Sequence, residues 1–330
     1  MRLVIALLVG AASAAAAAHF QDHSGKLGDF QAFWWSAKAL SLGLSPYDAI
    51  GPNGTLFKWN LETPYPLPGI LILWPLTLVP LRIAFLAFTF VSAAALAWQL
   101  SRDHRAAMWV FVSGSFLVAL YLGQWSPLLT AAALSPWLGI LLVAKPTIGA
   151  ALFLYRPSWI AVISGLLLLV LSLLVMPSWP VEWWGVVRQD SMDLHYRIPL
   201  TIPGGVLVLL ALLRWKRPES RLLVAMACVP QTMVANEFVP LFLVVRKRWE
   251  GLTLALLSWV MLFLRDELAR PQPGGLNDYA ISAQLGVLLL YLPAVAMVLR
   301  RPNEGDTPEL IAQVRRWLTW PARLRRPATP

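Results

Sequence analysis

Long apolar runs recur from one end of the chain to the other. The first follows Met1 and Arg2 and covers residues 3–18. The later runs cover 64–81 and lie near 83–100, 106–122, 125–134, 137–155, 158–176, 199–213, 222–245, 251–264 and 279–299. They lack the period-2 alternation of a transmembrane strand, which leaves the helix as the solution in hydrocarbon. The pattern predicts an all-α polytopic integral membrane protein with about 10–12 helices that cross or re-enter the membrane.

Three of these runs predict irregular helices. The prolines within 64–81 loosen its helix, which a membrane tolerates only where neighbouring groups satisfy the backbone. The run 125–134 is too short to cross about 30 Å of hydrocarbon, so it predicts a half-helix that ends at Ser135-Pro136. Basic residues flank 222–245 on both sides, so this run predicts a hairpin that turns near Asn236 and Glu237. We find no internal repeat.

The longest polar stretch between apolar runs covers residues 19–63. Apolar positions recur in it at helical spacing, at Phe30, Phe33, Trp34, Ala37, Leu40 and Leu44. Gln31 and Lys38 lie off that face, so the segment predicts an amphipathic helix on the membrane surface, ended by Gly43. The sequence of residues 45–48 predicts a turn after this helix.

Composition agrees with a membrane location. The 330 residues are 58% hydrophobic and 13% charged, with a mean hydropathy of +0.62. Soluble chains carry about 25% charged residues. The 17 tryptophans fit belts at the membrane interfaces. Cys228 is the single cysteine, which excludes an intrachain disulfide and argues against redox chemistry.

The net charge of +10 suggests nucleic acid, but the arginines cluster in short loops and in the C-terminal tail. The positive-inside rule explains this clustering more simply and places 214–221, 246–248 and the tail in the cytoplasm. Residues 1–300 are then expected to form a single transmembrane catalytic domain. Residues 301–330 form a basic cytoplasmic tail, in which 309–320 predicts a surface helix.

The same rule places 19–63 and 177–198 on the outer face of what is expected to be a plasma or inner membrane. Two points stay open. The Ala-rich end of 3–18 resembles a signal-peptide cleavage region, although an uncleaved first helix is the preferred interpretation. If 64–81 and 83–100 both cross, Arg102 and Arg105 fall outside, against the charge rule.

Asp29 follows the first apolar run and precedes the aromatic helix. As a structural residue it is a favoured helix cap. As a functional residue it is a general base at the membrane surface. The residues alone leave both interpretations open, and one carboxylate is able to serve both purposes.

Other polar residues lie within or beside apolar runs. Lys145 sits far from both ends of its run, where an ammonium is costly, so it is expected to face the bundle interior and to pair rather than snorkel. The same cost applies to Asn236 and Glu237, which are expected either to face the bundle interior or to form a turn solvated at the lipid headgroups. The sequence favours neither of these alternatives. Gly123-Gln124 opens the half-helix and is a weaker signal, because the pair is common in turns.

Further candidates have simpler structural explanations. Arg188, His195 and Arg197 lie in the second polar loop, 177–198, which is more typical of a solvated loop face. His19 and His23 have metal-ligand spacing but lack further ligands, so a solvated helix end is favoured. Phosphate-binding Gly-rich motifs are missing from the sequence, so soluble nucleotide chemistry is unsupported. We therefore expect no metal and no other cofactor.

Five short motifs occur in one order along the chain. They are Gly28-Asp29-Phe30, Tyr47, Tyr65-Pro66-Leu67-Pro68, Gly123-Gln124 and Lys145-Pro146-Thr147. Over about residues 1–160, with a weaker continuation to 245, this ordered set resembles glycosyltransferase family 87. These are membrane-embedded enzymes of the GT-C superfamily that use polyprenyl-phosphate sugars, typically mannose. The resemblance implies a GT-C-like helical bundle, with Asp29 as the base and Lys145 near the donor.

The chain departs from the family pattern in two places. The stretch from Gln124 to Lys145 is shorter than usual for the family. The run from Val229 to Glu237 lacks the His and the Trp that the family implies. A second acid–base group, the orientation of the donor and the identity of the sugar are therefore not carried over from the resemblance.

These observations predict an inverting glycosyltransferase that moves a sugar from a polyprenyl phosphate to a hydroxyl of a lipid or glycan acceptor on the outer face. Asp29 would accept the hydroxyl proton. Lys145, or else Arg188, Arg197 or His195, would bind the donor phosphate. The substrate pocket is expected to include Tyr65, Gln124, Asn236 and Glu237. Membrane lipids are expected partners, and nucleic acid is not.

Two rival functions come from other classes. A lipid or solute transporter is favoured by the broken helices but opposed by the missing repeat and by the external acid. A membrane scaffold without activity is compatible with the missing His and Trp.

Overall fold

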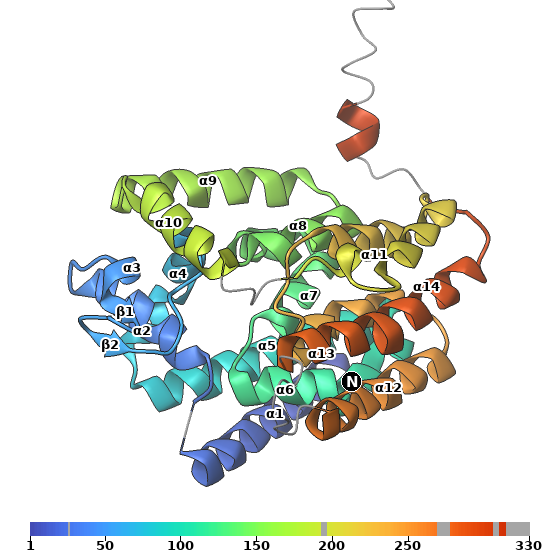
Figure 1. The fold of residues 1–330 in the computed structure, drawn as a ribbon, viewed down its shortest axis with the longest axis horizontal. Helices are drawn as coiled ribbons and strands as arrows, with labels where there is room; N and C mark the ends of the chain where they lie inside the picture. Colours follow the sequence, from blue (N-terminus) through green and yellow to red (C-terminus); the bar gives the residue numbers. More distant parts are fainter. Residues whose placement is uncertain (26, 193–196, 269–277, 306–309, 315–330) are drawn as a thin grey trace, which may run out of the picture.

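The computed structural model describes residues 1–25, 27–192, 197–268, 278–305 and 310–314 (Figure 1). The first half contains α1 (Arg2–Ser24), α2 (Phe30–Ser41), α3 (Pro46–Ala49), α4 (Leu67–Leu73), η1 (Trp74–Leu78), α5 (Leu81–Asp103), η2 (Arg105–Val112), α6 (Gly114–Leu122), α7 (Ser126–Leu134), η3 (Pro136–Ala144) and α8 (Pro146–Tyr155). Here η marks 3₁₀ helices.

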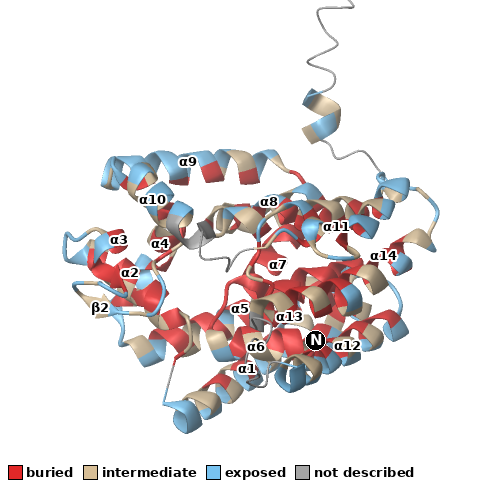
Figure 2. Ribbon diagram, viewed as in Figure 1, coloured by how far each residue is buried: buried red, intermediate tan, exposed pale blue. Residues whose placement is uncertain are grey.

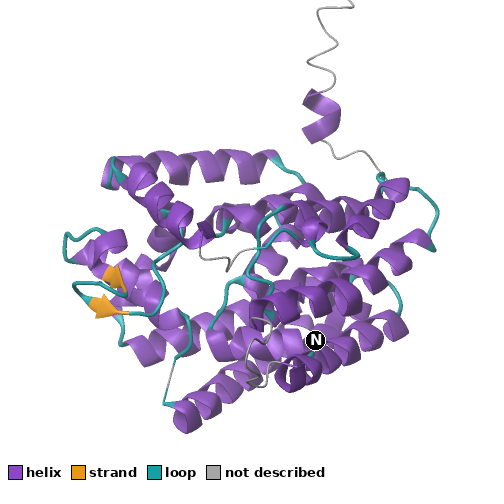
Figure 3. Cartoon of the chain, viewed as in Figure 1, coloured by secondary structure: helices purple, strands orange, loops and turns teal. Residues whose placement is uncertain are grey.

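The second half contains α9 (Trp159–Val175), α10 (Trp179–Met192), η4 (Pro199–Thr201), η5 (Gly205–Arg214), α11 (Pro218–Cys228), η6 (Ala235–Val244), α12 (Arg248–Leu268), α13 (Asp278–Gly286), the π-helical η7 (Val287–Tyr291) and α14 (Leu292–Leu299). Within the described ranges, the only strands are β1 (Ile50–Gly51) and β2 (Phe57–Lys58), a short parallel pair in which Ile50 lies opposite Phe57 (Figure 3). The chain is therefore nearly all helical, as the sequence predicts.

Among the described residues, three helices are long and apolar enough to cross a membrane, namely Arg2–Ser24, Leu81–Asp103 and Tyr279–Leu299. Two bent pairs raise this number to 5: η2 with α6, bent by 60°, and α9 with α10, bent by 101°. The shorter apolar helices are Leu67–Leu78, Pro146–Tyr155, Gly205–Arg214 and Ala235–Val244. These helices are consistent with an all-α membrane protein, and the larger count of about 10–12 remains a prediction.

Helices α1 and α5 run antiparallel in contact. Arg2 donates to the Trp98 carbonyl at 3.0 Å, and Asp22 pairs with Arg82 at 2.7 Å at the other end of both helices. Small residues make the approach possible, because a Cβ on Gly10 would lie 3.0 Å from Phe90 and Ala94. The two helices therefore cross the bundle in opposite directions.

This pairing answers the question that the sequence left open about 64–81. Trp34 in α2 donates to the Leu76 carbonyl in η1 at 3.1 Å, so the Pro-rich segment stays at the end of the bundle that holds α2. Only α5 then passes to the opposite end, which brings Arg102 and Arg105 to the end where Arg2 lies. With 64–81 at the end that holds α2, the structure no longer brings Arg102 and Arg105 to the same end as the predicted outer segments.

Basic side chains gather at that end, which we call the basic end and define by Arg2, Arg102, Arg105, Arg156, Arg217, Arg221, Arg246 and Arg301. Glu219, fully buried in the first turn of α11, links three of them, with Arg246 at 2.8 Å, Arg301 at 3.4 Å and Arg217 at 3.9 Å. The opposite end, here the loop end, carries α2, α3, both strands and α10, at the left of Figure 1.

The two predicted outer segments lie together at the loop end. Ser45 donates to the Glu182 carboxylate at 2.5 Å, and the Trp183 indole donates to the Pro64 carbonyl at 2.9 Å. Segment 19–63 therefore contacts segment 177–198. Which side of a membrane they face remains a prediction.

Helix α2 has the predicted bounds but a different environment. Its apolar residues were expected to lie on the membrane surface, yet Phe30, Phe33, Trp34 and Ala37 are buried in protein, against α4 and η1. Trp35 stacks on Phe57 of β2, with ring centroids 5.5 Å apart. The surface prediction was wrong because the loop that follows folds back and covers the helix.

Four further predictions concern short segments. The predicted turn at 45–48 is the one-turn helix α3, in which the Ser45 hydroxyl accepts from the Tyr47 N–H at 3.3 Å. The predicted tail helix at 309–320 falls mostly outside the described residues. The predicted half-helix at 125–134 is α7, which is buried along its length (Figure 2). The predicted hairpin at 222–245 is α11 and η6, with the turn at 229–234, just before Asn236.

Candidate functional site

Five of the predicted site residues converge in one place, although they come from five separate segments. We call the set Asp29, Tyr65, Gln124, Lys145 and Glu237 the polar cluster. Gln124 donates to Asp29 at 2.5 Å, and Lys145 donates to Glu237 at 2.5 Å. The charges of Asp29 and Glu237 both act on Tyr65, and the charge of Lys145 acts on Asp29. Buried polar groups gathered from distant segments are typical of functional sites.

Two glycines bring the segments of Asp29 and Gln124 together. Gly28 has φ +56°, and a Cβ on it would lie 2.5 Å from the Leu122 Cα. Gly123 has φ +64°, and a Cβ on it would lie 2.7 Å from the Phe30 Cβ. Each glycine thus precedes a cluster residue and packs against the other segment, where no side chain fits.

The Asp29 carboxylate does not cap α2. Asp29 is the residue before the helix, but its own backbone is helical and its side chain makes no capping hydrogen bond. Burial raises the pKa of Asp29, while the hydrogen bond from Gln124 and then the charge of Lys145 oppose the rise. Of the two interpretations, the structure removes the cap and leaves a buried carboxylate with an amide partner.

Lys145 ends η3 and precedes α8, so it lies at a break between two helices. Its side chain is 15% exposed, and that of Glu237 is fully buried. The second Glu237 oxygen accepts from the Met233 N–H at 2.9 Å, and Met233 itself has a left-handed φ of 56°. The sequence predicts a paired ammonium here, and its partner is another of the candidate residues. Its contact with a donor phosphate remains a prediction.

Tyr65 is buried within reach of the charges of both acidic residues. Its ring meets that of Phe33 edge-on at 4.5 Å, and its carbonyl accepts from the Tyr47 hydroxyl at 3.2 Å. Burial, followed by the charges of Asp29 and Glu237, raises the pKa of Tyr65 well above its ordinary value. Tyr65 therefore stays a neutral phenol.

An apolar groove of about 680 Å³ begins beside the polar cluster. Pro66 and Pro146, the sequence neighbours of Tyr65 and Lys145, are among its lining residues. Helices α4, η3, α8, α9 and α10 supply the others, including Pro68, Val143, Phe153, Leu166 and Trp183. The outer face of α9 is apolar and exposed, as expected for contact with lipid (Figure 2).

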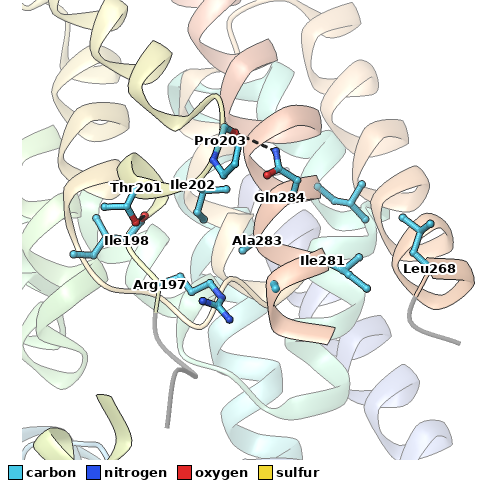
Figure 4. A pocket seen from close by; sticks show the side chains of 11 residues that line it. Arg197, Ile198, Thr201, Ile202, Pro203, Leu268, Ile281, Ala283 and Gln284 are labelled. Carbon is cyan, nitrogen blue, oxygen red and sulfur yellow. Dashed lines mark hydrogen bonds between the residues drawn. The ribbon is translucent and has the colours of Figure 1, made fainter. Parts of the chain in front are cut away.

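Arg197 lines a different cavity, of about 580 Å³ (Figure 4). Its backbone pairs with that of Gln231 at 2.7 Å and 2.9 Å, two residues before Met233. The buried Nε of Arg197 has no hydrogen-bond partner among the residues that the structure describes. The walls of this cavity are mostly apolar, and the Gln284 amide donates to the Pro203 carbonyl at 3.1 Å. Arg197 therefore approaches the polar cluster through its backbone only.

The remaining predicted site residues divide into three cases. Asn236 is buried in η6 beside Glu237 in sequence. Arg188 is exposed near the end of α10. His195 lies outside the described residues. Among the residues that the structure describes, the Asn236 side chain makes no hydrogen bond to the polar cluster.

Sequence reasoning missed the Gln231–Tyr291 pair. The Gln231 amide donates to the Tyr291 hydroxyl at 3.0 Å, and both side chains are buried. Gln231 follows Pro230 in the hairpin turn, which was a usable signal. Tyr291 gave no such signal in the sequence, because a tyrosine in an apolar run is equally typical of an ordinary hydrophobic core.

The two N-terminal histidines form no recognisable metal site. Their rings lie 4.1 Å apart, and a His23 ring nitrogen is 2.8 Å from the His19 carbonyl. No group of three His, Cys, Asp or Glu side chains close enough to hold a metal occurs in the described part of the chain.

No protein-family model, curated protein or solved structure matches this chain. The function is therefore argued from the polar cluster and the groove beside it.

Proposed function

We propose that the protein is a membrane glycosyltransferase that moves a sugar, most simply mannose, from a polyprenyl phosphate to an acceptor hydroxyl. The observation that carries the proposal is the convergence of Asp29, Tyr65, Gln124, Lys145 and Glu237. The motifs that resemble glycosyltransferase family 87 supply four of these residues, and in sequence they are up to about 115 positions apart.

Asp29 is the proposed base. The acceptor oxygen attacks the anomeric carbon, the bond from that carbon to the phosphate oxygen breaks, and the hydroxyl proton passes to Asp29. The phosphate leaves on the polyprenyl chain, and the anomeric configuration inverts. A carboxylate whose pKa is raised by burial is a better proton acceptor than an exposed one, and the Gln124 amide fixes its orientation.

The leaving phosphate gains negative charge, so the reaction needs a cation or hydrogen-bond donors. Lys145 is the proposed cation. In the absence of donor it is neutralised by Glu237, so a bound phosphate would compete with this carboxylate for the ammonium protons. Arg188 and His195 are alternative cations for the same role, whereas the Arg197 side chain lines a different cavity. The Tyr65 hydroxyl is a further donor within the polar cluster.

The apolar groove supports a lipid-linked donor. A polyprenyl chain is a long hydrocarbon, and the groove offers apolar walls that start at Pro66 and Pro146, next to the polar cluster. Its position beside the exposed apolar face of α9 suits entry from a membrane. We propose that the site faces the outer side of the membrane, since the basic end lies opposite.

The test uses the purified full chain in lipid nanodiscs with polyprenyl-phosphate mannose as donor. A short-chain alkyl mannoside and a total membrane lipid extract serve as acceptors, and polyprenyl-phosphate glucose is the competing donor. We expect transfer that Asp29→Asn lowers strongly and that Asp48→Asn, a change at an exposed acid of the same loop region, leaves unchanged. Equal transfer by the Asp29→Asn variant would refute the proposal.

A transporter is the second candidate, and one observation favours it. The Lys145–Glu237 pair sits where a broken helix, η3–α8, meets η6, a place where transporters bind their cargo. Vesicle assays separate the two functions. Movement of a fluorescent polyprenyl phosphate across the bilayer, without sugar transfer to any acceptor, would favour transport.

A further inference from the structure

A polar cavity of about 270 Å³ lies at the basic end of the bundle, and none of its lining residues belongs to the polar cluster. Two links form it, the one between α5 and η2 and the one between η6 and α12. Its lining residues are Arg102, Asp103, His104, Arg105, Ala106, Val245 and Arg246. We call it the basic cavity, because three guanidinium groups and one carboxylate line it.

The three arginines use only part of their donor capacity. In each, the hydrogen bond or ion pair of the side chain is made by Nε: Arg102 with Asp103 at 3.3 Å, Arg105 with the Ser101 carbonyl at 3.4 Å, and Arg246 with Glu219 at 2.8 Å. Their terminal nitrogens make no hydrogen bond within the described ranges. Planar guanidinium groups with spare donors are suited to bind phosphate oxygens.

The rear of the cavity is rigid. Glu219, fully buried, fixes Arg246, and Glu250 accepts from the Arg246 N–H at 2.7 Å. A His104 ring nitrogen is 3.1 Å from the Tyr155 hydroxyl. Burial, followed by the charge of Arg246, lowers the pKa of His104, so the imidazole is neutral at pH 7 and adds no charge. The lining carries two net positive charges, three from the arginines less one from Asp103.

Three exposed tryptophans lie on α5, η2 and α12, the helices next to this cavity in the chain. Trp98, Trp109 and Trp249 are 39%, 37% and 45% exposed. The Arg2 guanidinium lies over the Trp98 ring, 4.4 Å from its centroid. Gly251 packs closely against Trp109 and the Ala106 carbonyl, so that a Cβ there would contact both. Exposed tryptophans mark the level of lipid headgroups in membrane proteins. The cavity therefore opens where the phosphates of a bilayer would lie.

We propose that the basic cavity binds a phosphate group, and specifically the phosphate of an anionic lipid held by Arg102, Arg105 and Arg246. The site differs from the proposed donor site in position and in residues, so it would exist whatever reaction the polar cluster performs. Basic pockets between helices on the cytoplasmic side are a known way to hold anionic headgroups. The bound lipid would brace the α5–η2 link against the η6–α12 link.

The experiment is native mass spectrometry of the purified full chain in detergent, with phosphatidylglycerol added, and with phosphatidylcholine of the same acyl chains as reference. We expect selective retention of phosphatidylglycerol. Arg102→Gln with Arg105→Gln should weaken it by about tenfold or more, since each basic residue contributes on the order of 1 kcal/mol. Both residues are exposed, so the double variant should fold, which its melting temperature checks.

A matched variant removes two positive charges from the loop end, Lys58→Gln with Arg82→Gln, and should retain the lipid like the parent. Inorganic phosphate, titrated calorimetrically into parent and double variant, tests a soluble source. Phosphate binding that the double variant loses, without selectivity for phosphatidylglycerol, would support the site with a soluble ligand instead. Equal loss in the matched variant, no loss in the double variant, or no binding of either probe would overturn the proposal.

Discussion

Gln124 donates a hydrogen bond of 2.5 Å to the Asp29 carboxylate, and the two residues are 95 positions apart in the chain. The bond depends on two close backbone approaches, Gly28 against Leu122 and Gly123 against Phe30. Each motif of the sequence, Gly28-Asp29-Phe30 and Gly123-Gln124, thus consists of a spacer glycine and a polar residue. The pair explains why these short motifs belong together.

Replacing Asp29 by Asn should lower sugar transfer by roughly 10²–10⁴-fold, because an amide does not accept the acceptor's proton. Folding should be retained, since the Asn oxygen still accepts from Gln124 and no cap is lost. The measurement is transfer from polyprenyl-phosphate mannose at equal protein yield. Asp48→Asn serves as the control. A variant with parent activity would leave Asp29 without a catalytic role.

The pH dependence of the parent should follow Asp29. Transfer needs the ionised base, so the rate should rise with pH around a midpoint above the ordinary value of about 3.9, because burial raises the pKa of Asp29. The residual rate of Asp29→Asn should lack this step. A midpoint at or below the ordinary value would show that Asp29 is not the titrating base.

The contribution of Asp29 to folding stability should fall as pH rises, whereas the transfer rate should increase. The folded-state pKa of Asp29 lies above its unfolded value, so the folded protein holds the proton more tightly. Its contribution to stability is full below the unfolded pKa and is lost as pH rises through the folded one. At neutral pH, Asp29→Asn should therefore melt at or above the temperature of the parent, by tryptophan fluorescence. A clearly lower melting temperature would contradict this.

The Lys145–Glu237 pair should behave as a buried ion pair. Lys145→Met leaves a carboxylate unpaired, and we expect a loss of about 3–5 kcal/mol. Adding Glu237→Gln should recover most of that loss, because the Gln oxygen still accepts from Met233. Denaturant titration of both single variants and the double variant measures the coupling. Additive losses would mean that the two side chains do not interact.

Gly123→Ala should destabilise the protein more than Gly43→Ala. Both residues have left-handed backbones, with φ +64° and +71°, so both substitutions cost about 1–2 kcal/mol of backbone strain. A Cβ on Gly43 meets nothing within 4 Å, whereas one on Gly123 would lie 2.7 Å from Phe30. The difference between the melting temperatures of the two variants measures the cost of the contact between the new Cβ and Phe30. Equal losses would show that this close contact at Gly123 does not affect stability.

The two ends of the bundle should lie on opposite sides of the membrane. In a Cys228→Ala background, Asn53→Cys reports on the loop end and Glu304→Cys on the basic end. Both positions are exposed. An impermeant maleimide added to intact cells should label Asn53→Cys only, as the positive-inside rule requires. Labelling of Glu304→Cys in intact cells would invert the topology.

The pattern of residues along the chain was enough to predict the local elements of this protein. Helical spacing of apolar residues located α2, the lengths of apolar runs located α5 and the short α7, and Pro146 marked the break at Lys145. It also singled out the polar residues that hydrocarbon makes costly, because the cost of an isolated charge is a local property.

Which of these residues meet is a property of the packed helices, and the sequence pattern did not predict it. The packing paired Lys145 with Glu237, turned Asp29 toward Gln124 and away from the end of α2, and kept the segment 64–81 at the loop end. Helical periodicity reports on neighbours within about four positions, which share one face of a helix. Contacts between Asp29 and Gln124 depend instead on how helices pack, and packing is set by side-chain shapes that lie far apart in the chain.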